Sequence, residues 1–351
     1  MPSDEQFMKR ALELAQNGRY TVSPNPMVGC VIVRDGNTLS VGWHRRAGEA
    51  HAEIDALRAC EDAHGATMYV TLEPCAHYGR TPPCVDAVIA ARPARVVIAM
   101  ADPHREHSGG IARLREAGIE VTVGVLEFEA RRLNEKFIWS ASQKLPFVVV
   151  KAGMTLDGKL ATVTRDSQWI TTEASREVSL RMREEYDAIV VGSGTVIADD
   201  PRLTRRMNLA SGLPWTRVVL DGDGEVPPHA QVFNDGGRTI LFTSRDPGLP
   251  ANVEVVQTGG RLDLERVFGE LYARGVHSLI VEGGAIVHSE VIRAGLWQKM
   301  VLFIAPMIVG GAEAPSIFSG EAVARLTDAY RFRFDRAEFV GSDLMLTAYP
   351  V

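Results

Sequence analysis

The sequence has little cysteine, no long apolar run and no excess of positive charge. Four cysteines in 351 residues are too few for a disulfide-rich secreted scaffold, which makes metal binding or catalysis the better interpretation of them. The longest apolar stretches, such as 301–305, are far shorter than the roughly 20 residues that cross a bilayer. The first ten residues, MPSDEQFMKR, lack a signal-peptide pattern. We therefore expect a cytoplasmic protein with no membrane association.

The charge balance is slightly acidic. The formal net charge is −6, with 44 Asp and Glu against 38 Lys and Arg, whereas a protein that binds nucleic acid normally presents a basic face. We therefore expect no nucleic-acid partner, and an enzyme with a small-molecule substrate fits this composition. Apolar residues make up 46% of the chain, enough for ordinary globular cores. A single core usually stops growing before this length, so two domains are expected.

Strand-like and helix-like segments alternate along both halves, which predicts mostly parallel sheets covered by helices. The domain boundary is expected in the polar stretch 140–145, giving domains 1–145 and 146–351. In the first half we expect helices over 5–16, 51–63, 85–91 and 111–118, and strands over 27–34, 67–72, 95–100 and 119–124. In the second half we expect strands over 146–153, 187–192, 216–222, 238–244, 253–258, 277–284 and 299–306, and helices over 173–186, 262–275 and 285–295.

The strongest chemical signal is a set of zinc-ligand types around one acidic residue. His51, Cys75 and Cys84 supply one nitrogen and two sulfurs, and a hydrolytic zinc needs three protein ligands and an open position for water. Glu53, two residues after His51, is placed to move the proton between that water and a leaving amine. The pattern H-x-E, then P-C and a further Cys, is the signature of zinc nucleobase deaminases. We expect His51 and Cys84 each to open a helix, where the positive helix end favours a thiolate.

A closed structural zinc is the alternative, with His44 or His77 as a fourth ligand, but it does not explain Glu53. Cys30 and Cys60 lie in apolar segments and are expected to pack in the core. The general deaminase pattern has Cys-x-x-Cys, whereas here the eight residues AHYGRTPP separate the two cysteines. This insertion is expected to shape the substrate pocket.

Longer motifs resemble one family over nearly the whole chain. They are PNPMVGCVIV, HAE, TLEPCAHYGRTPPC, AGMTLDGKLA, SQWIT, VGSGTVIADDPRLTRR and VEGG. With them the chain resembles the RibD family of bifunctional riboflavin-biosynthesis enzymes. The resemblance implies a cytidine-deaminase-like α/β/α domain followed by a dihydrofolate-reductase-like α/β domain. The absence of G-x-G-x-x-G after the first strand of either half agrees with a reductase that is not a Rossmann dehydrogenase.

The resemblance implies two consecutive reactions. The 2-amino group of 2,5-diamino-6-(5-phosphoribosylamino)pyrimidin-4-one is first hydrolysed to a carbonyl. In that step it assigns one zinc ion to His51, Cys75 and Cys84 and proton transfer to Glu53. The ribosyl unit of the product is then reduced to ribityl with NADPH. By the same resemblance the deaminase substrate would be contacted by Asn25, His44, His77 and Arg80.

The resemblance also assigns residues in the reductase half and suggests a homodimer or a higher homo-oligomer. Two arginines there would suit the ribose phosphate, and Lys151 is placed near hydride transfer or is simply a surface lysine. The implied substrate contacts are Ser167, Arg183, Leu203, Arg206 and Glu282. The implied NADPH contacts are Met154, Trp169, Thr195, Asp199, Gly284, Ala285 and Ile286.

Three departures from the family pattern keep alternatives open. DPHREHSGG replaces a DPNP segment beside the zinc pocket, Gly222 stands where the family usually has Ser, and Trp297-Gln298-Lys299 replaces a Val-Asp-Glu segment. One alternative is a zinc deaminase of another nucleobase, including a tRNA-editing enzyme. The other is a reductase half that is degenerate, kept for oligomerisation or substrate binding, or altered in its substrate.

Overall fold

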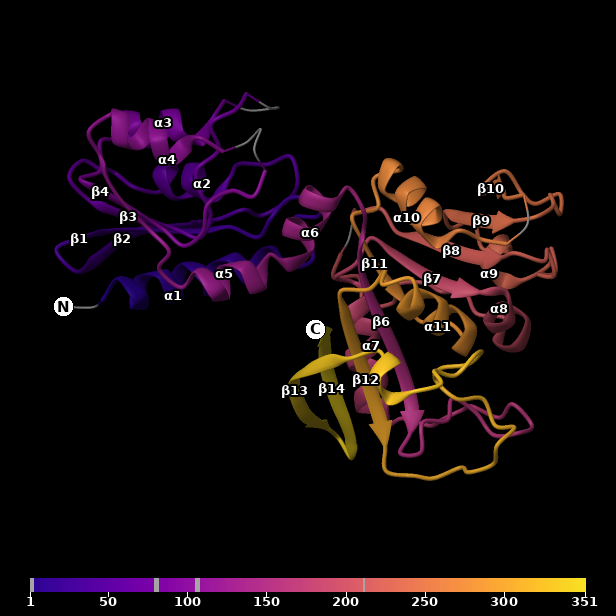
Figure 1. The fold of residues 1–351 in the computed structure, drawn as a ribbon. Helices are drawn as coiled ribbons and strands as arrows, with labels where there is room; N and C mark the ends of the chain where they lie inside the picture. Colours follow the sequence, from indigo (N-terminus) through magenta and orange to yellow (C-terminus); the bar gives the residue numbers. More distant parts are fainter. Residues whose placement is uncertain (1–2, 79–81, 105–107, 211, 260) are drawn as a thin grey trace. The chain divides into compact units, whose positions relative to one another are not determined.

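The computed structural model describes residues 3–78, 82–104, 108–210, 212–259 and 261–351. The chain divides into two compact units, 1–144 and 145–351. Each unit is an α/β structure with its own sheet (Figure 1). Among the described residues, no helix combines the length and apolar character that a membrane crossing requires.

The first unit is built on a five-stranded sheet in the order β2-β1-β3-β4-β5. The expectation of a mostly parallel sheet is wrong for one side of it, because β1 pairs antiparallel with both β2 and β3. β3, β4 and β5 are parallel. Strand β2 was not predicted, because its exposed first residues do not alternate cleanly with apolar ones. The strands are β1 Gly29–Arg34, β2 Asn37–Trp43, β3 Thr67–Val70, β4 Arg95–Ile98 and β5 Glu120–Val123.

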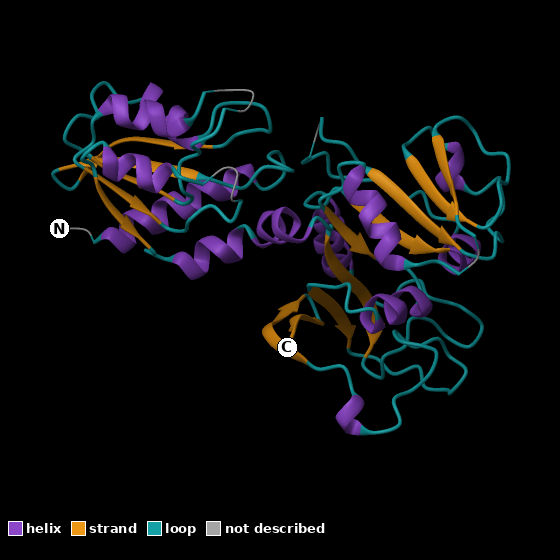
Figure 2. Cartoon of the chain, turned by 45° about the horizontal axis from the view of Figure 1, so that its top comes forward, coloured by secondary structure: helices purple, strands orange, loops and turns teal. Residues whose placement is uncertain are grey.

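Helices cover both faces of this sheet, with α1 and α5 on one side and α2, α3 and α4 on the other (Figures 1 and 2). Two glycines let helices approach closely. A Cβ at Gly29 would lie 2.0 Å from the Ala11 carbonyl oxygen of α1, and one at Gly42 would lie 2.3 Å from the Ala56 nitrogen of α2. The helices are α1 Asp4–Ala15, α2 Ala52–Arg58, α3 Cys84–Ala91, α4 Gly110–Glu116, α5 Glu127–Leu133 and α6 Glu135–Gln143, with a 3-10 turn Gln16–Gly18 after α1.

Helices α5 and α6 were not predicted. The polar stretch 140–145, in which the domain boundary is expected, is mostly the end of α6, and Lys144 ends that helix in a left-handed conformation. The chain enters the first strand of the second unit at Phe147. Helix α6 therefore belongs to the first unit although it lies next to the boundary in sequence.

The second unit has a nine-stranded sheet in the order β10-β9-β8-β7-β11-β6-β12-β14-β13. The strands from β10 to β12 are parallel, whereas β14 runs antiparallel to β12 and β13. The predicted strands correspond to β6 Phe147–Thr155, β7 Ala188–Gly192, β8 Thr216–Asp221, β9 Thr239–Thr243, β10 Val253–Gln257, β11 Ser278–Val281 and β12 Lys299–Ala305. The unpredicted hairpin is β13 Phe332–Val340 with β14 Asp343–Pro350.

The helices of this unit follow the parallel strands. Three correspond to the predicted ones, whereas α8 and α9 are too short to show a helical apolar period. The helices are α7 Glu173–Arg183, α8 Ser193–Asp199, α9 Gln231–Asn234, α10 Leu264–Ala273 and α11 Ala285–Arg293, with a 3-10 turn Leu326–Asp328.

The unusual segment Trp297-Gln298-Lys299 has a structural role. Trp297 is 6% exposed and belongs to the core of the second unit. The Gln298 side-chain oxygen accepts the Val148 N–H at 2.7 Å, and the Gln298 N–H donates to the Val148 carbonyl at 2.9 Å. Both bonds join β6 to the start of β12.

We predict that Gln298→Ala lowers the free energy of unfolding of the second unit by about 1–3 kcal/mol, because it leaves the buried Val148 N–H without its acceptor. Thermal unfolding followed by circular dichroism measures the change. Gln257→Ala, at an exposed position on β10, is the control and should leave the transition unchanged. A Gln298→Ala transition equal to that of the control would contradict the role.

Candidate active sites

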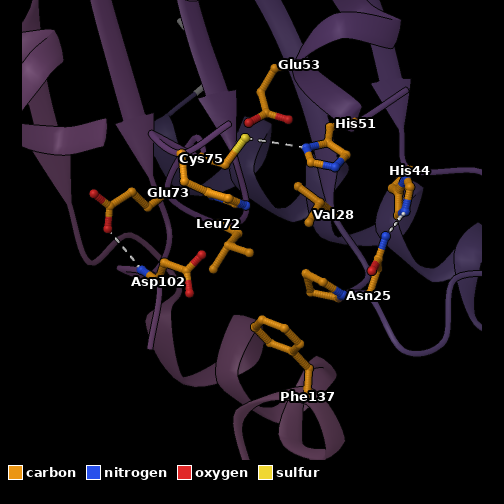
Figure 3. A pocket seen from close by; sticks show the side chains of 12 residues that line it. Asn25, Val28, His44, His51, Glu53, Leu72, Glu73, Cys75, Asp102 and Phe137 are labelled. Carbon is orange, nitrogen blue, oxygen red and sulfur yellow. Dashed lines mark hydrogen bonds between the residues drawn. The ribbon is translucent and has the colours of Figure 1, made fainter. Parts of the chain in front are cut away.

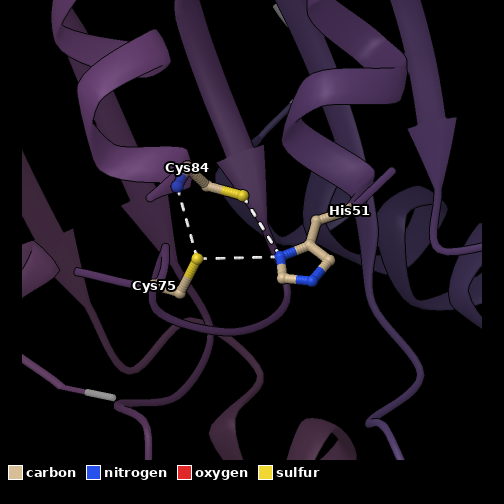
Figure 4. A group of neighbouring side chains, drawn as sticks. All are labelled: His51, Cys75 and Cys84. Atoms are coloured by element: carbon tan, nitrogen blue, oxygen red, sulfur yellow. Dashed lines mark hydrogen bonds between the residues drawn. The ribbon is translucent and has the colours of Figure 1, made fainter. Parts of the chain in front are cut away.

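Three ligand-type side chains meet where two helices begin. His51 is the N-cap of α2 and Cys84 is the first residue of α3, so the expectation that each opens a helix is confirmed. Cys75 lies in the loop after β3. The His51 Nδ1 atom lies 3.2 Å from the Cys84 Sγ and 3.7 Å from the Cys75 Sγ (Figure 4). All three ligand atoms lie within 4.8 Å of one another.

These separations fit a tetrahedral zinc site. Zn–N and Zn–S bonds of about 2.0 and 2.3 Å place a nitrogen and a sulfur ligand about 3.5 Å apart, close to the observed distances. The backbone N–H of Cys84 also donates to the Cys75 Sγ at 3.3 Å. The hydrogen bond with Cys84 lowers the pKa of Cys75 to about 4, whereas the one with Cys75 and burial raise the pKa of Cys84. A divalent cation would replace the proton that the two sulfurs share.

Glu53 lies in the first turn of α2 beside this group. Its side chain is 3% exposed, and burial raises the pKa of its carboxyl group to about 7. It lines a cavity together with His51 and Cys75 (Figure 3). The arrangement therefore combines a possible metal site with a buried carboxyl group that does not belong to the ligand cluster.

A hydrogen-bonded pair forms another wall of the cavity. The Asn25 Nδ2 atom lies 3.0 Å from the His44 Nε2, and the His44 Nδ1 lies 3.0 Å from the Ala50 carbonyl oxygen. The carbonyl can only accept, so His44 carries its proton on Nδ1 and accepts from the Asn25 amide. Burial lowers the pKa of His44, which favours this neutral form. His44 therefore fixes the orientation of the Asn25 amide.

Of the other residues expected in this pocket, His77 lines the cavity, whereas Arg80 lies outside the described residues. Several residues that the sequence did not single out also line it. Among them, Glu73 lies in the TLEPC motif and Asp102 in the DP pair, so a sequence signal marks both. No motif contains Phe137. The additional lining residues are Pro26, Val28, Leu72, Glu73, Asp102 and Phe137.

Glu73 holds the loop after β4 against the cavity. Its carboxylate accepts the backbone N–H groups of Asp102 at 3.0 Å, Gly109 at 3.0 Å and Ile111 at 2.9 Å. A Cβ at Gly110 would lie 2.0 Å from the Pro74 carbonyl oxygen, so α4 begins in close contact with the turn that carries Cys75. The described part of the DPHREHSGG segment is therefore tied to the metal-ligand turn.

The second unit gathers an ionic cluster. The Arg183 guanidinium donates two hydrogen bonds of 2.8 Å to the two carboxylate oxygens of Glu282, and the Lys151 Nζ lies 3.7 Å from the same carboxylate. Arg183 also donates to the Thr204 carbonyl at 3.5 Å, which brings it to the segment of Leu203 and Arg206. Burial raises the pKa of Glu282, but the positive charges of Arg183 and Lys151 outweigh it and lower that pKa to about 2.

Two glycine turns lie side by side after β7 and β11. A Cβ at Gly283 would lie 2.6 Å from the Val191 Cα, and one at Gly284, where φ is +56°, would lie 3.5 Å from the Thr195 Oγ1. Thr195 and Gly284 are thus neighbours, as two contacts of one cofactor would be. Ala285 and Ile286 begin α11, and the Ile286 side chain is 72% exposed.

The remaining residues expected in the reductase site differ in how exposed they are. Trp169 is 66% exposed and stacks under the Arg176 guanidinium at 4.4 Å. Leu203 is buried, whereas Arg206 and Asp199 are exposed. A Cβ at Gly222 would meet only Leu262, at 3.6 Å, so a serine there would have room. The other two expected residues are Met154 at the end of β6 and Ser167 in the loop before α7.

Comparisons with known proteins decide the family. Residues 146–346 match the model of the RibD C-terminal domain, and residues 1–100 match that of the cytidine and deoxycytidylate deaminase zinc-binding region. The chain is 41% identical to the riboflavin biosynthesis protein RibD of Bacillus amyloliquefaciens, covering 99% of this chain and 96% of that protein. It is 40% identical to the RibD of Escherichia coli K12, covering 98% of each. The chain belongs to the RibD family.

Solved structures agree with this membership. The RibD-type deaminase and reductase of Thermotoga maritima superposes with a TM-score of 0.91 at 38% identity, covering 99% of both chains. The RibD of Acinetobacter baumannii gives 0.90 at 35% identity, again covering 99% of both. The chain is therefore a bifunctional enzyme of riboflavin biosynthesis, and the expected fold class, a deaminase-type α/β/α unit before a reductase-type α/β unit, is confirmed.

We predict that Glu282→Gln destabilises the reductase unit by about 3 kcal/mol, because it leaves two cations, whose side chains are only 14% exposed, without their carboxylate. The wild-type pKa of about 2 is lower than the ordinary 4.5. The ionised Glu282 carboxylate therefore contributes its full stabilisation above about pH 4.5, and this stabilisation is lost as the pH falls towards 2. Thermal unfolding between pH 7 and pH 3 measures both effects. Equal midpoints for the variant and the wild type across this range would exclude the stabilising role.

Proposed function

We propose that the first unit hydrolyses the 2-amino group of 2,5-diamino-6-(5-phosphoribosylamino)pyrimidin-4-one. The observation that carries this proposal is the cavity shared by the His51, Cys75 and Cys84 cluster, Glu53 and the Asn25–His44 pair. The name of the Thermotoga maritima neighbour, a diaminohydroxyphosphoribosylaminopyrimidine deaminase and 5-amino-6-(5-phosphoribosylamino)uracil reductase, supports this substrate.

In this proposal, each residue that the sequence predicted for the deaminase site has a role. His51, Cys75 and Cys84 would hold zinc, which when bound supplies an activated water at neutral pH. Glu53 takes a proton from the attacking water and gives one to the departing amine. The amide of Asn25, oriented by His44, hydrogen-bonds the pyrimidine edge. His77 contributes to the lining of the pocket, and Arg80, which lies outside the described residues, would bind the substrate phosphate.

We further propose that the second unit reduces the ribosyl group of the deaminated product with NADPH, which supplies the hydride. The adjoining glycine turns at Gly283 and Gly284, with Thr195 beside them, suit the close approach of a phosphate-containing cofactor. Lys151, Arg183 and Glu282 form a charged wall suited to the phosphate and hydroxyl groups of the sugar. Trp169, Met154, Asp199, Ala285 and Ile286 complete the cofactor side, and Ser167, Leu203 and Arg206 the substrate side.

A homodimer through the second unit is also proposed. β13 is the last strand of its sheet, and its exposed side chains include Phe334 at 65% and Phe339 at 80%. An exposed apolar edge strand is normally covered by a partner. Sedimentation should give a mass of twice 38.3 kDa, and Phe334→Asp together with Phe339→Asp should shift it to the monomer. A monomeric wild type would refute the assembly.

The substrate is tested by ammonia release. We expect ammonia from the phosphoribosyl diaminopyrimidine and none from transfer RNA. Ammonia from RNA alone would overturn the proposed substrate and favour a nucleic-acid deaminase.

We predict that Glu53→Gln retains zinc and loses deamination by at least a hundredfold, because the proton carrier is removed while the ligands stay. Cys75→Ala should lose zinc, since two protein ligands bind it far more weakly than three. Metal analysis and ammonia release measure these effects. Reductase turnover on the deaminated substrate is the internal control and should survive in both variants. Loss of zinc from Glu53→Gln, or retained turnover, would contradict the proton-transfer role.

A further inference from the structure

The cavity of the first unit has an aromatic wall that comes from outside the zinc-binding region. Phe137 lies on α6, well beyond residues 1–100 that match the deaminase region. It nevertheless lines the same cavity as His51 and Glu53. Figure 3 shows its ring pointing into the cavity on the side opposite the His51 and Cys75 pair. The last helix of the unit thus completes the site.

A buried asparagine holds this helix against the loop that carries Asn25. The Asn134 Oδ1 accepts the Met27 N–H at 2.8 Å, and its Nδ2 donates to the Met27 carbonyl at 2.9 Å. Asn134 is 2% exposed, so both bonds are shielded from water. Because Asn25 is two residues before Met27 and Phe137 is three residues after Asn134, this clamp fixes the two walls relative to each other.

Phe137 and its neighbour Ile138 have different surroundings on the same helix. Ile138 packs against the hydrophobic core of the first unit. Phe137 is half-buried, lines the cavity, and among the described residues is not one of the side chains packed on that core. Phe137 is the largest apolar side chain among the described residues that line the cavity, which also include Pro26, Val28 and Leu72. A flat heterocycle would pack against such a ring.

We propose that Phe137 is a substrate-binding residue of the deaminase site, packing its ring against the pyrimidine of the substrate. This inference rests on the proposed deamination. An aromatic face binds a heterocycle largely independently of its substituents, so it positions the ring while Asn25 and Glu53 act on its edge. The contact is equal before and during the reaction, so it should lower KM without changing kcat.

The test compares four variants of the full-length enzyme by deamination kinetics, with ammonia release from the phosphoribosyl diaminopyrimidine as readout. We expect Phe137→Ala to raise KM about tenfold or more with kcat within about twofold of the wild type. Phe137→Tyr should keep a wild-type KM, and Phe137→Leu should lie between. Ile138→Ala is the matched control, expected to lower the midpoint of thermal unfolding and to leave KM unchanged.

Zinc content and the reductase rate of every variant should equal those of the wild type. An unchanged KM in Phe137→Ala would overturn the proposal, and so would a full rescue by leucine, because leucine offers no aromatic face. If Phe137→Ala fails to fold, comparing the KM of Phe137→Tyr with that of Phe137→Leu still tests whether an aromatic ring is required. A wild type that releases no ammonia from this substrate would refute the proposed deamination itself, which separates the two failures.

Discussion

The arrangement of the first unit's site depends on one constraint, which is that the N-terminal ends of α2 and α3 lie close together. His51 stands at the start of α2 and Cys84 at the start of α3, with Cys75 in the turn after β3. The N-terminal ends of helices favour negative charge, so this is where a thiolate ligand is stabilised. The same geometry places Glu53, in the first turn of α2, beside this cluster yet buried from bulk water. A displacement of either helix would separate Glu53 from the cluster of His51, Cys75 and Cys84.

The surrounding structure maintains this meeting point. Gly42 allows α2 to lie directly on β2, and Gly110 allows α4 to lie against the Pro74 carbonyl. Glu73 ties the loop after β4 to the turn of Cys75 through three backbone hydrogen bonds. An element farther along the chain adds to the lining of the pocket, because α6 contributes Phe137 and Asn134 holds that helix against Met27. The zinc-binding region alone is therefore an incomplete pocket.

In the second unit, neighbouring parallel strands bring the expected site residues together. β6, β11 and β7 are neighbours, so the glycine turn of VEGG meets the turn that precedes Thr195. The same arrangement brings Glu282, just after β11, to Lys151 of β6 and Arg183 of α7. The Glu282 carboxylate can remain ionised at this part-buried position because two cations pair with it. Such a cluster is suited to a polar sugar, whereas the turns are suited to a cofactor.

Sequence patterns predicted the segments with a continuous or periodic run of apolar residues and the segment with a rare combination of ligand-type residues. The buried parallel strands and the His51, Cys75 and Cys84 cluster fall into these two classes. Strand β2 was missed because half of it is exposed, and the β13–β14 hairpin because β13 is almost entirely exposed. Phe137 was missed because helix α6, on which it lies, was not predicted and no motif marks this residue. Only the fold shows that it faces a cavity and that Ile138 faces the core.

The central claim is that one chain performs two consecutive reactions at two separate sites. The most direct measurement is mass spectrometry of the products formed by the zinc-loaded wild type from the diaminopyrimidine, with and without NADPH. Without NADPH, we predict one product in which oxygen has replaced the amino group. With NADPH, we predict the same product carrying two additional hydrogens. Addition of hydrogens to the undeaminated substrate, or no further conversion with NADPH present, would contradict the account.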